Sequence, residues 1–323
     1  MVSDSLISVL CFSKDRPLQL EAYLDSLFRF SAEPLQVSVL YSCGPIFRTA
    51  YDKLKSYFPH VNFIRETDFK TQVLNYLEQV KSPFFMFGCD DVIFKRPWRP
   101  EEICKLFRDF RGLFGFSLRL GKEISWQQVL NRNMSKPNFL ETNPFLVWRW
   151  PIARGVDWSY PWELTCTIYP TQLVRAMLTI MKKLDWGHPN RLEGLGAYLA
   201  KPTMGLEWMA HYIPVRANVL TKSSRRILIP ISFLSFLFFL PRVFCLTRGL
   251  DFMASYPSAR ASVVTINRVQ DVVLDPIYDS GLTVDLLLEK WNKGTILDID
   301  AYKGRSYPSM HIGDVHFCSR LKK

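Results

Sequence analysis

Two adjacent aspartates, Asp90 and Asp91, are the residues whose type and spacing most clearly suggest chemistry. They follow PFFMFG (residues 83–88), an apolar run typical of a buried strand. Burying a carboxylate is costly unless it is paired or binds a cation. Mg²⁺ and Mn²⁺ often take one or two carboxylates together with substrate phosphates. The pair therefore predicts a metal ion that bridges a diphosphate. The alternative is a strand-terminal turn with solvated aspartates.

Further polar side chains follow two other predicted strands. After residues 6–12 come Ser13, Asp15 and Arg16, and after residues 61–64 come Glu66, Asp68 and Lys70. Ligands of open α/β sheets bind outside the carboxyl ends of the strands. We therefore expect these side chains to gather with the aspartates at one edge of a sheet.

The elements that must position these groups alternate along the chain. Apolar runs predict strands over residues 6–12, 36–41, 61–64 and 83–88, and helical spacing predicts helices over 18–28, 47–58 and 70–81. This alternation predicts an α/β fold with a mixed, mostly parallel sheet flanked by helices. Later in the chain we expect helices over 168–184 and 282–294 and a strand over 263–267.

The first 95 residues resemble a family-2 glycosyltransferase of the GT-A fold. The resemblance rests on ISVLCFSKDRPLQLEAYLDSL and on FFMFGCDDVIF, which matches the D-x-D-type element that this family commonly writes x-D-D. It implies that Asp91 ligates Mn²⁺ or Mg²⁺ and that Asp90 contacts the metal or the ribose. It also implies the following donor-side residues: Ser13, Asp15 and Arg16 near the base and ribose, and Glu66, Asp68 and Lys70 beyond the third strand.

Two later segments extend the resemblance. WGHPNRLEG (186–194) matches the stretch that presents an acid to the acceptor, which implies that Glu193 is the catalytic base of an inverting transferase. The alternative is a helix N-terminal glutamate that interacts with the helix dipole. In SMHIGDVHF, His311 fits a C-terminal histidine that completes the metal site, and His316 is the second candidate. A surface loop histidine is the alternative for either.

One departure from the family pattern follows WSYPW. Related sequences often carry Asp-Gly there, whereas this chain has Thr165-Cys166, which predicts altered specificity or reduced activity. The surrounding segment (residues 92–200) holds seven of the nine tryptophans. We expect them mainly to pack in the core and loops, with stacking on sugar faces as the alternative.

The charge is uneven. Of a net charge of +11, six positive charges lie in residues 208–250, which contain no acidic residue. They flank an apolar run of 15 residues, 227–241, which contains Pro230 and is shorter than the roughly 20 residues needed to span a bilayer. The pattern predicts a segment lying on an anionic membrane surface, with a buried core helix as the alternative. Nucleic acid is disfavoured as a partner, because the charge is not spread along one face.

Composition excludes other classes. With 48% hydrophobic residues the chain is not intrinsically disordered. The seven cysteines are widely spaced without a C-x-x-C motif, which is typical of a reducing compartment. The N-terminus carries Asp4 and no basic stretch before its apolar run, which indicates a first strand rather than a signal peptide. We therefore expect a cytoplasmic protein, peripheral on a membrane.

The leading hypothesis is a metal-dependent glycosyltransferase. It would transfer a sugar from a nucleotide-diphosphate sugar to a glycan, lipid-linked or small-molecule acceptor. The expected division of the chain is a nucleotide-sugar half (1–95), an acceptor-side half (96–207), a basic apolar insert (208–256) and a segment that closes the active site (257–323). A nucleotidyltransferase is disfavoured, because the SKDRP turn has no glycine. A membrane-bound scaffold with a degenerate transferase fold is the non-enzyme alternative.

Overall fold

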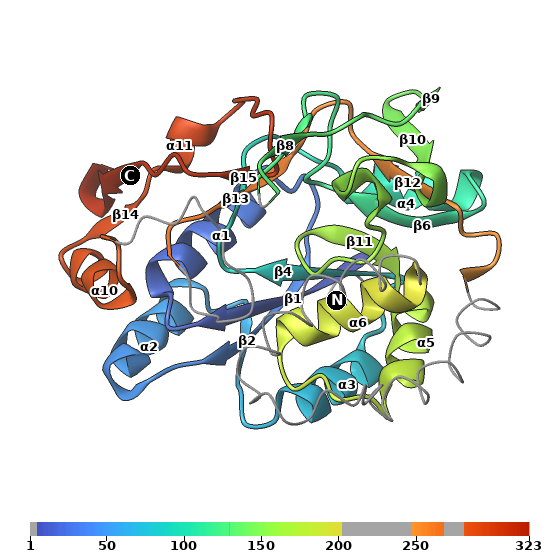
Figure 1. Ribbon diagram of the computed structural model, residues 1–323. Helices are drawn as coiled ribbons and strands as arrows, with labels where there is room; N and C mark the ends of the chain where they lie inside the picture. Colours follow the sequence, from blue (N-terminus) through green and yellow to red (C-terminus); the bar gives the residue numbers. More distant parts are fainter. Residues whose placement is uncertain (1–4, 129, 202–246, 268–280, 323) are drawn as a thin grey trace, which may run out of the picture.

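The computed structural model describes residues 5–128, 130–201, 247–267 and 281–322. Its centre is a nine-stranded sheet, shown in Figure 1. In spatial order the strands are β3 (Asn62–Arg65), β2 (Gln36–Ser42), β1 (Ile7–Lys14), β4 (Phe84–Cys89), β11 (Thr167–Pro170), β6 (Leu113–Ser117), β12 (Phe252–Ser255), β10 (Phe145–Arg149) and β9 (Leu140–Thr142).

The sheet is mixed but mostly parallel, as predicted. β3, β2, β1 and β4 pair in parallel, β12 is parallel to β6, and only β11 and β10 run opposite to the other strands of this sheet. The carboxyl ends of the first four strands therefore meet at one edge. The register there pairs Phe12 of β1 with Cys89 of β4, which places the β1–α1 turn beside the aspartates.

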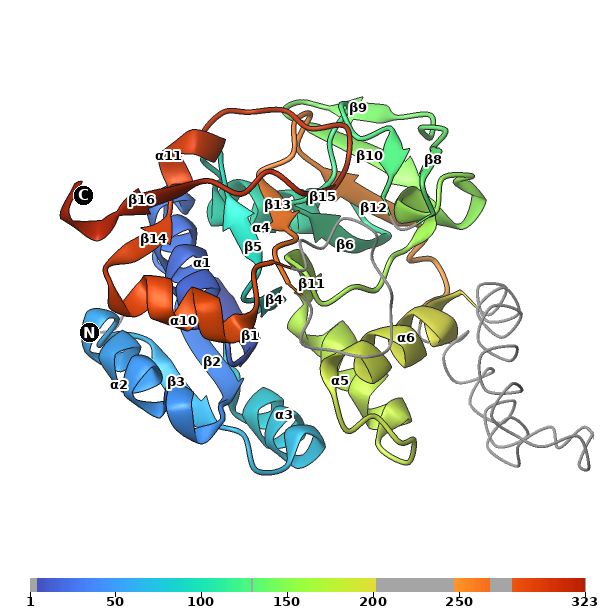
Figure 2. The same cartoon turned by 60° about the vertical axis from the view of Figure 1, so that its left-hand side comes forward.

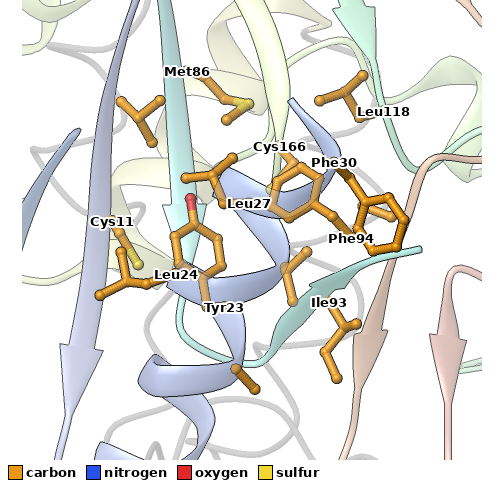
Figure 3. Packing of buried hydrophobic residues seen from close by; sticks show 14 of the residues in the cluster. Cys11, Tyr23, Leu24, Leu27, Phe30, Met86, Ile93, Phe94, Leu118 and Cys166 are labelled. Carbon is orange, nitrogen blue, oxygen red and sulfur yellow. The ribbon is translucent and has the colours of Figure 1, made fainter. Parts of the chain in front are cut away.

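Helices cover both faces of the sheet. Alternate residues of a strand point to opposite faces. Val9 and Cys11 of β1 share a core with α1 (Pro17–Phe30), α2 (Arg48–Tyr57), α4 (Pro100–Asp109) and α10 (Val284–Asn292). Figure 3 shows residues of α1 packing over β1 and β4. Leu10 and Phe12 join the second core, with α3 (Phe69–Gln79), α5 (Thr171–Met181) and α6 (Pro189–Ala200).

A small sheet links the C-terminal segment to the strand that follows the aspartates. Its order is β15 (His311–Ile312), β13 (Ala261–Val264) and β5 (Val92–Phe94). In Figure 2, β14 (Thr295–Leu297), β16 (Phe317–Ser319) and α11 (Ile299–Tyr302) lie at the α1 side of the molecule. The remaining short elements are β7 (Trp126–Gln127), β8 (Arg132–Asn133), η1 (Pro45–Phe47), η2 (Trp150–Ile152), η3 (Asp157–Ser159) and η4 (Arg320–Lys322).

The predicted elements of the first 90 residues agree with the structure to within a few residues. The helix predicted over 168–184 is wrong at its start, because residues 167–170 form β11 and α5 begins at Thr171. β11 fits between β4 and β6, so partners distant in sequence override the local helical spacing. Residues 252–255, assigned to the end of the insert, form β12 of the central sheet.

Six of the seven tryptophans in the aromatic segment are buried, which agrees with the packing interpretation: Trp98, Trp148, Trp150, Trp158, Trp162 and Trp186. Trp126 is partly exposed. Most of the basic insert, residues 208–246, lies outside the described residues, so its predicted membrane contact stays a prediction. Within the described ranges, no helix is both long and apolar enough to cross a bilayer.

Candidate active site

The turn after β1 is held by its own side chains. Asp15 has a left-handed backbone (φ 52°), and its Oδ1 accepts a hydrogen bond from the Gly44 amide at 2.7 Å. The Ser13 hydroxyl lies 2.7 Å from the Tyr51 hydroxyl, which also accepts a hydrogen bond from the Arg16 amide at 3.3 Å. These contacts fix the turn at the carboxyl end of β1, so that the Arg16 side chain reaches the end of β4.

Arg16 lies between the two aspartates. Its Nη1 is 3.1 Å from Asp90 Oδ1 and 3.1 Å from Asp91 Oδ2. The Arg16 and Asp90 side chains are 7% and 5% exposed, whereas Asp91 is 22% exposed. The Lys14 amide donates to Asp90 Oδ2 at 3.3 Å, and Arg16 Nη2 donates to the Asn267 carbonyl. Arg16, which the resemblance places near the base and ribose, is thus the counter-ion of the paired carboxylates.

The electrostatics of the pair differ between its members. Burial raises the pKa of the Asp90 carboxyl, the Arg16 guanidinium partly offsets this, and the neighbouring Asp91 carboxylate adds to it. With both carboxylates ionised, one guanidinium leaves a net charge of about −1 on the trio. A diphosphate brought to this edge would be repelled unless a further cation came with it.

Asp91 is the member of the pair that suits a metal ion. Its Oδ2 faces Arg16, and its second carboxylate oxygen accepts no hydrogen bond from the residues that the structure describes. Those residues contain no cluster of three or more His, Cys, Asp or Glu side chains able to hold a metal. Mg²⁺ sites commonly use one or two carboxylates and take the remaining oxygens from phosphates and water. The donor set therefore fits a metal completed by a diphosphate rather than a site built wholly by protein.

The two candidate histidines lie in different surroundings. His311 in β15 pairs with Val263 of β13, which on its other side pairs with Val92, the residue after Asp91. Burial lowers the pKa of His311 to about 3, and Arg119 contributes, so the ring is neutral, the form that binds metals. The His316 amide instead donates to the Tyr302 hydroxyl, and its ring packs on Tyr302. His311 is therefore the candidate nearer to the aspartates.

Glu193 lies on α6 and binds the loop before β11. Its Oε2 accepts a hydrogen bond from the Leu164 amide at 3.4 Å. Burial raises the pKa of Glu193, while Arg119, the Leu164 amide and the Tyr160 hydroxyl oppose the rise. Burial is the main reason that the pKa of the half-buried Cys89 thiol is raised, and the Asp91 and Glu193 carboxylates raise it further. The aspartates and Glu193 thus share one neighbourhood, although they are about a hundred residues apart.

A close approach of α6 to the loop sets the position of Glu193. A Cβ atom added to Gly196 would collide with the indole ring of Trp162. Only glycine lets the helix backbone come this near. Because Gly196 follows Glu193 by less than one helical turn, this contact holds the carboxylate against the loop.

The structure separates the three residues predicted after β3. Glu66 is half-buried at the carboxyl end of β3, and burial raises its pKa while Lys14 opposes this. Asp68 caps α3 by accepting a hydrogen bond from the Thr71 amide at 3.0 Å. Lys70 Nζ donates to the Leu184 carbonyl at 2.8 Å and lies over the Trp186 ring. Glu66 therefore stays near the carboxyl edge, while Asp68 and Lys70 have structural contacts.

The departure from the family pattern falls on an unusual backbone. Cys166 is buried and has φ 66°, a left-handed conformation that favours glycine. Its amide donates to the Phe87 carbonyl at 2.9 Å, which joins the loop to β4. This backbone conformation suits the glycine that the family pattern implies at residue 166.

Sequence reasoning missed one buried ion pair at this site. Arg119 Nη2 contacts Glu163 Oε2, and the two side chains are 5% and 6% exposed. The Thr167 hydroxyl also donates to Glu163. Glu163 directly follows WSYPW, but Arg119 stands in no recognisable motif, and the two residues are 44 positions apart. No signal in the sequence alone could have paired them.

Comparison with known proteins gives one curated relative with a sequence match along most of the chain. No protein-family model matches the sequence. The chain is 27% identical over 336 aligned residues to the bifunctional glycosyltransferase pgtA of Dictyostelium discoideum. The alignment covers 96% of this chain and 39% of that protein, so the chain spans about two fifths of its relative's length.

Among solved structures, S. aureus TarS is 19% identical, with 60% of this chain and 33% of that chain covered and a TM-score of 0.38. TarS residues 1–349 in complex with UDP-GlcNAc gives 18% identity, coverage of 60% and 53%, and a TM-score of 0.37. At these TM-scores neither superposition carries an argument about the chain. The similarity to a protein named as a bifunctional glycosyltransferase thus extends over nearly the whole chain, and the mixed α/β sheet agrees with the fold that the resemblance implies.

Proposed function

We propose that the chain is a metal-dependent glycosyltransferase that moves a sugar from a nucleotide-diphosphate sugar to an acceptor hydroxyl. The observation that carries the proposal is that Asp90 and Asp91, at the carboxyl edge of the parallel strands, are linked through Cys89 and Leu164 to the partly buried Glu193. Similarity to a protein named as a glycosyltransferase supports the reaction class.

The donor would bind at the carboxyl edge of β1, β2, β3 and β4. Ser13 and Asp15 lie at the end of β1 and in the turn that follows it, beside the aspartates, whereas Glu66 follows β3, two strands further along the sheet. Asp91 would hold Mn²⁺ or Mg²⁺, with His311 as a second candidate ligand. A bound metal would supply positive charge to the departing diphosphate. Arg16 holds both aspartates in one orientation and balances part of their charge.

Glu193 is the proposed base. Burial raises the pKa of Glu193 toward neutral pH, and a carboxylate with a higher pKa accepts a proton more readily. As the acceptor hydroxyl gives its proton to Glu193, its oxygen bonds to the anomeric carbon. The bond from that carbon to the diphosphate breaks, and its electron pair leaves with the nucleoside diphosphate. A single displacement of this kind inverts the anomeric configuration.

The test is hydrolysis and transfer with a panel of nucleotide sugars, each with Mn²⁺, with Mg²⁺ and with EDTA. We expect turnover of at least one donor, its loss in EDTA, and a fall of about 100-fold or more in Asp91→Ala. Asp52→Ala removes an exposed aspartate of α2 and should keep full activity. Equal rates for Asp91→Ala and the unaltered protein would refute the proposed metal site.

A degenerate, non-catalytic scaffold is the second candidate, and two observations favour it. Arg16 already contacts both carboxylates, and a cysteine occupies the left-handed position at residue 166. This candidate predicts no turnover with any donor by a folded protein. The basic insert would then serve membrane attachment, which flotation with anionic and neutral liposomes measures. Recovery only with anionic vesicles supports attachment, and equal recovery in the soluble fraction with both contradicts it.

A further inference from the structure

In the buried Arg119–Glu163 pair, Arg119 lowers the pKa values of Glu193 and His311, whereas Glu163 has no assigned role in the site. Both side chains are almost completely buried. A buried ion pair is often no more stabilising than apolar residues of the same shape, so stability alone gives little reason for one here. Its surroundings point to a different use.

The pair fixes the loop that precedes β11. Arg119 follows β6, and β6 pairs with β11 through Ser117 and Thr167. The Glu163 carboxylate accepts hydrogen bonds from the hydroxyls of Thr165 and Thr167. The loop backbone is held as well, because the Glu163 amide donates to the Tyr169 hydroxyl at 2.8 Å. Residues 163–167 are therefore held through both their backbone and the Glu163 side chain.

This loop connects Glu193 to the strand that leads to the aspartates. The Leu164 amide donates to Glu193 Oε2 at 3.4 Å, and the Leu164 carbonyl accepts a hydrogen bond from the Cys89 thiol at 3.7 Å. Cys89 directly precedes Asp90. A displacement of Glu163 would thus move the group that holds the Glu193 carboxylate.

Arg119 also supplies positive charge that lowers the pKa of this carboxyl. The pKa of Glu193 is lowered by Arg119, the Leu164 amide and the Tyr160 hydroxyl. Glu193 in turn raises the pKa of Cys89 and of Tyr169. Arg119 is the positively charged member of this set. Its Nε is buried and has no hydrogen-bond partner among the described residues, so Glu163 does not use all of its donors.

We propose that the Arg119–Glu163 pair positions Glu193: Glu163 fixes the loop whose Leu164 amide binds the Glu193 carboxylate, and Arg119 provides the positive charge that faces it. The inference rests on the proposed role of Glu193 as base. The pair does not touch the reacting atoms, so both members are positioning residues.

The test is a pH titration of the Glu193 carboxyl carbon by NMR in the full chain labelled with [5-¹³C]glutamate, with Glu193→Gln identifying the signal. Arg119→Met removes the positive charge and should raise the titration midpoint by about 1. Glu163→Gln keeps the shape that holds the loop but removes the negative charge beside Arg119, so it should lower the midpoint by about 1 pH unit. Glu163→Ala also releases the loop and with it the Leu164 amide, so its midpoint should be higher than that of Glu163→Gln. Opposite shifts of Arg119→Met and Glu163→Gln, together with a higher midpoint in Glu163→Ala than in Glu163→Gln, support the proposal, because charge alone would give the two Glu163 variants the same midpoint.

Arg191→Met is the matched control, since Arg191 lies on the same helix and pairs with Asp185 in an exposed position. It should leave the midpoint unchanged. If Arg119→Met does not fold, the two Glu163 variants decide, because a lowered midpoint in Glu163→Gln with a higher one in Glu163→Ala supports the proposal. An unchanged or raised midpoint in Glu163→Gln, shifts of the same sign in Arg119→Met and Glu163→Gln, or a midpoint in Glu163→Ala no higher than in Glu163→Gln overturns it.

Activity separates this inference from the proposed function. In a chain that turns over a donor, the acidic limb of the kcat/KM profile should follow the midpoints of these variants. A chain with no transferase activity still yields the titration, so the function can fail while the inference holds. Turnover with an unmoved midpoint would reject the inference alone.

Discussion

Replacing Arg16 by methionine tests whether this side chain is the counter-ion of the paired aspartates. Arg16 makes two 3.1 Å contacts to carboxylates, one of them on a side chain that is 5% exposed. Methionine keeps much of the length and apolar stem but removes the charge. Asp90 would then be a buried carboxylate without its cation.

The expected loss follows from burial. Breaking a buried ion pair by removing one partner costs about 3–5 kcal/mol in the free energy of unfolding, because the other charge stays behind. Asp91 is more exposed and should add little. The double variant Arg16→Met/Asp90→Asn removes the stranded charge, so we expect it to recover about 2 kcal/mol or more of the loss.

Urea unfolding of metal-free protein, followed by tryptophan fluorescence, measures these differences. Arg29→Met is the matched control, because Arg29 lies on α1 and pairs with Asp300 where the two side chains are 35% and 61% exposed. Such a pair contributes only about 0–1 kcal/mol. If Arg16→Met cost no more than Arg29→Met, or if Asp90→Asn failed to restore stability, the counter-ion interpretation would be wrong.

Two further predictions concern packing and a buried lysine. Gly196→Ala should push α6 away from Trp162 and lower both stability and donor turnover. The Cβ atom of Gly194→Ala, on the same helix, meets no atom within 4 Å, so this variant should gain about 0.5–1 kcal/mol in the free energy of unfolding. Thermal unfolding and the donor assay check both variants. Burial lowers the pKa of Lys95 to about 7, so the unfolded chain binds more protons between about pH 7 and 10 and the stability of the unaltered protein should rise over that range. Lys95→Met should therefore be more stable by roughly 3–5 kcal/mol at pH 7, with the difference shrinking toward pH 10, and a difference independent of pH would contradict the assignment.

The first half of the fold could be predicted because its signals are local. In β1 the apolar run marks a strand buried on both faces, and in α1 the apolar spacing marks one helical face. β11 lacked such a signal, since its four residues become a strand only between β4 and β6. Asp90 and Asp91 were recognisable as a pair in sequence. That Arg16 binds them depends on the register of β1 with β4, which no single segment encodes.

The Thr165-Cys166 departure shows why a local difference need not mean a lost site. The Cys166 side chain lies in the core that it shares with Cys11 and Ile168, so a thiol there gains burial that glycine would not. A left-handed backbone costs a non-glycine residue roughly 1–2 kcal/mol, which that burial partly offsets. The Thr165 hydroxyl is 3.4 Å from Glu163 Oε2, where an aspartate would place a second carboxylate beside the first. The carboxylate of this loop is that of Glu163, which pairs with Arg119, and the Thr165 hydroxyl is compatible with that arrangement.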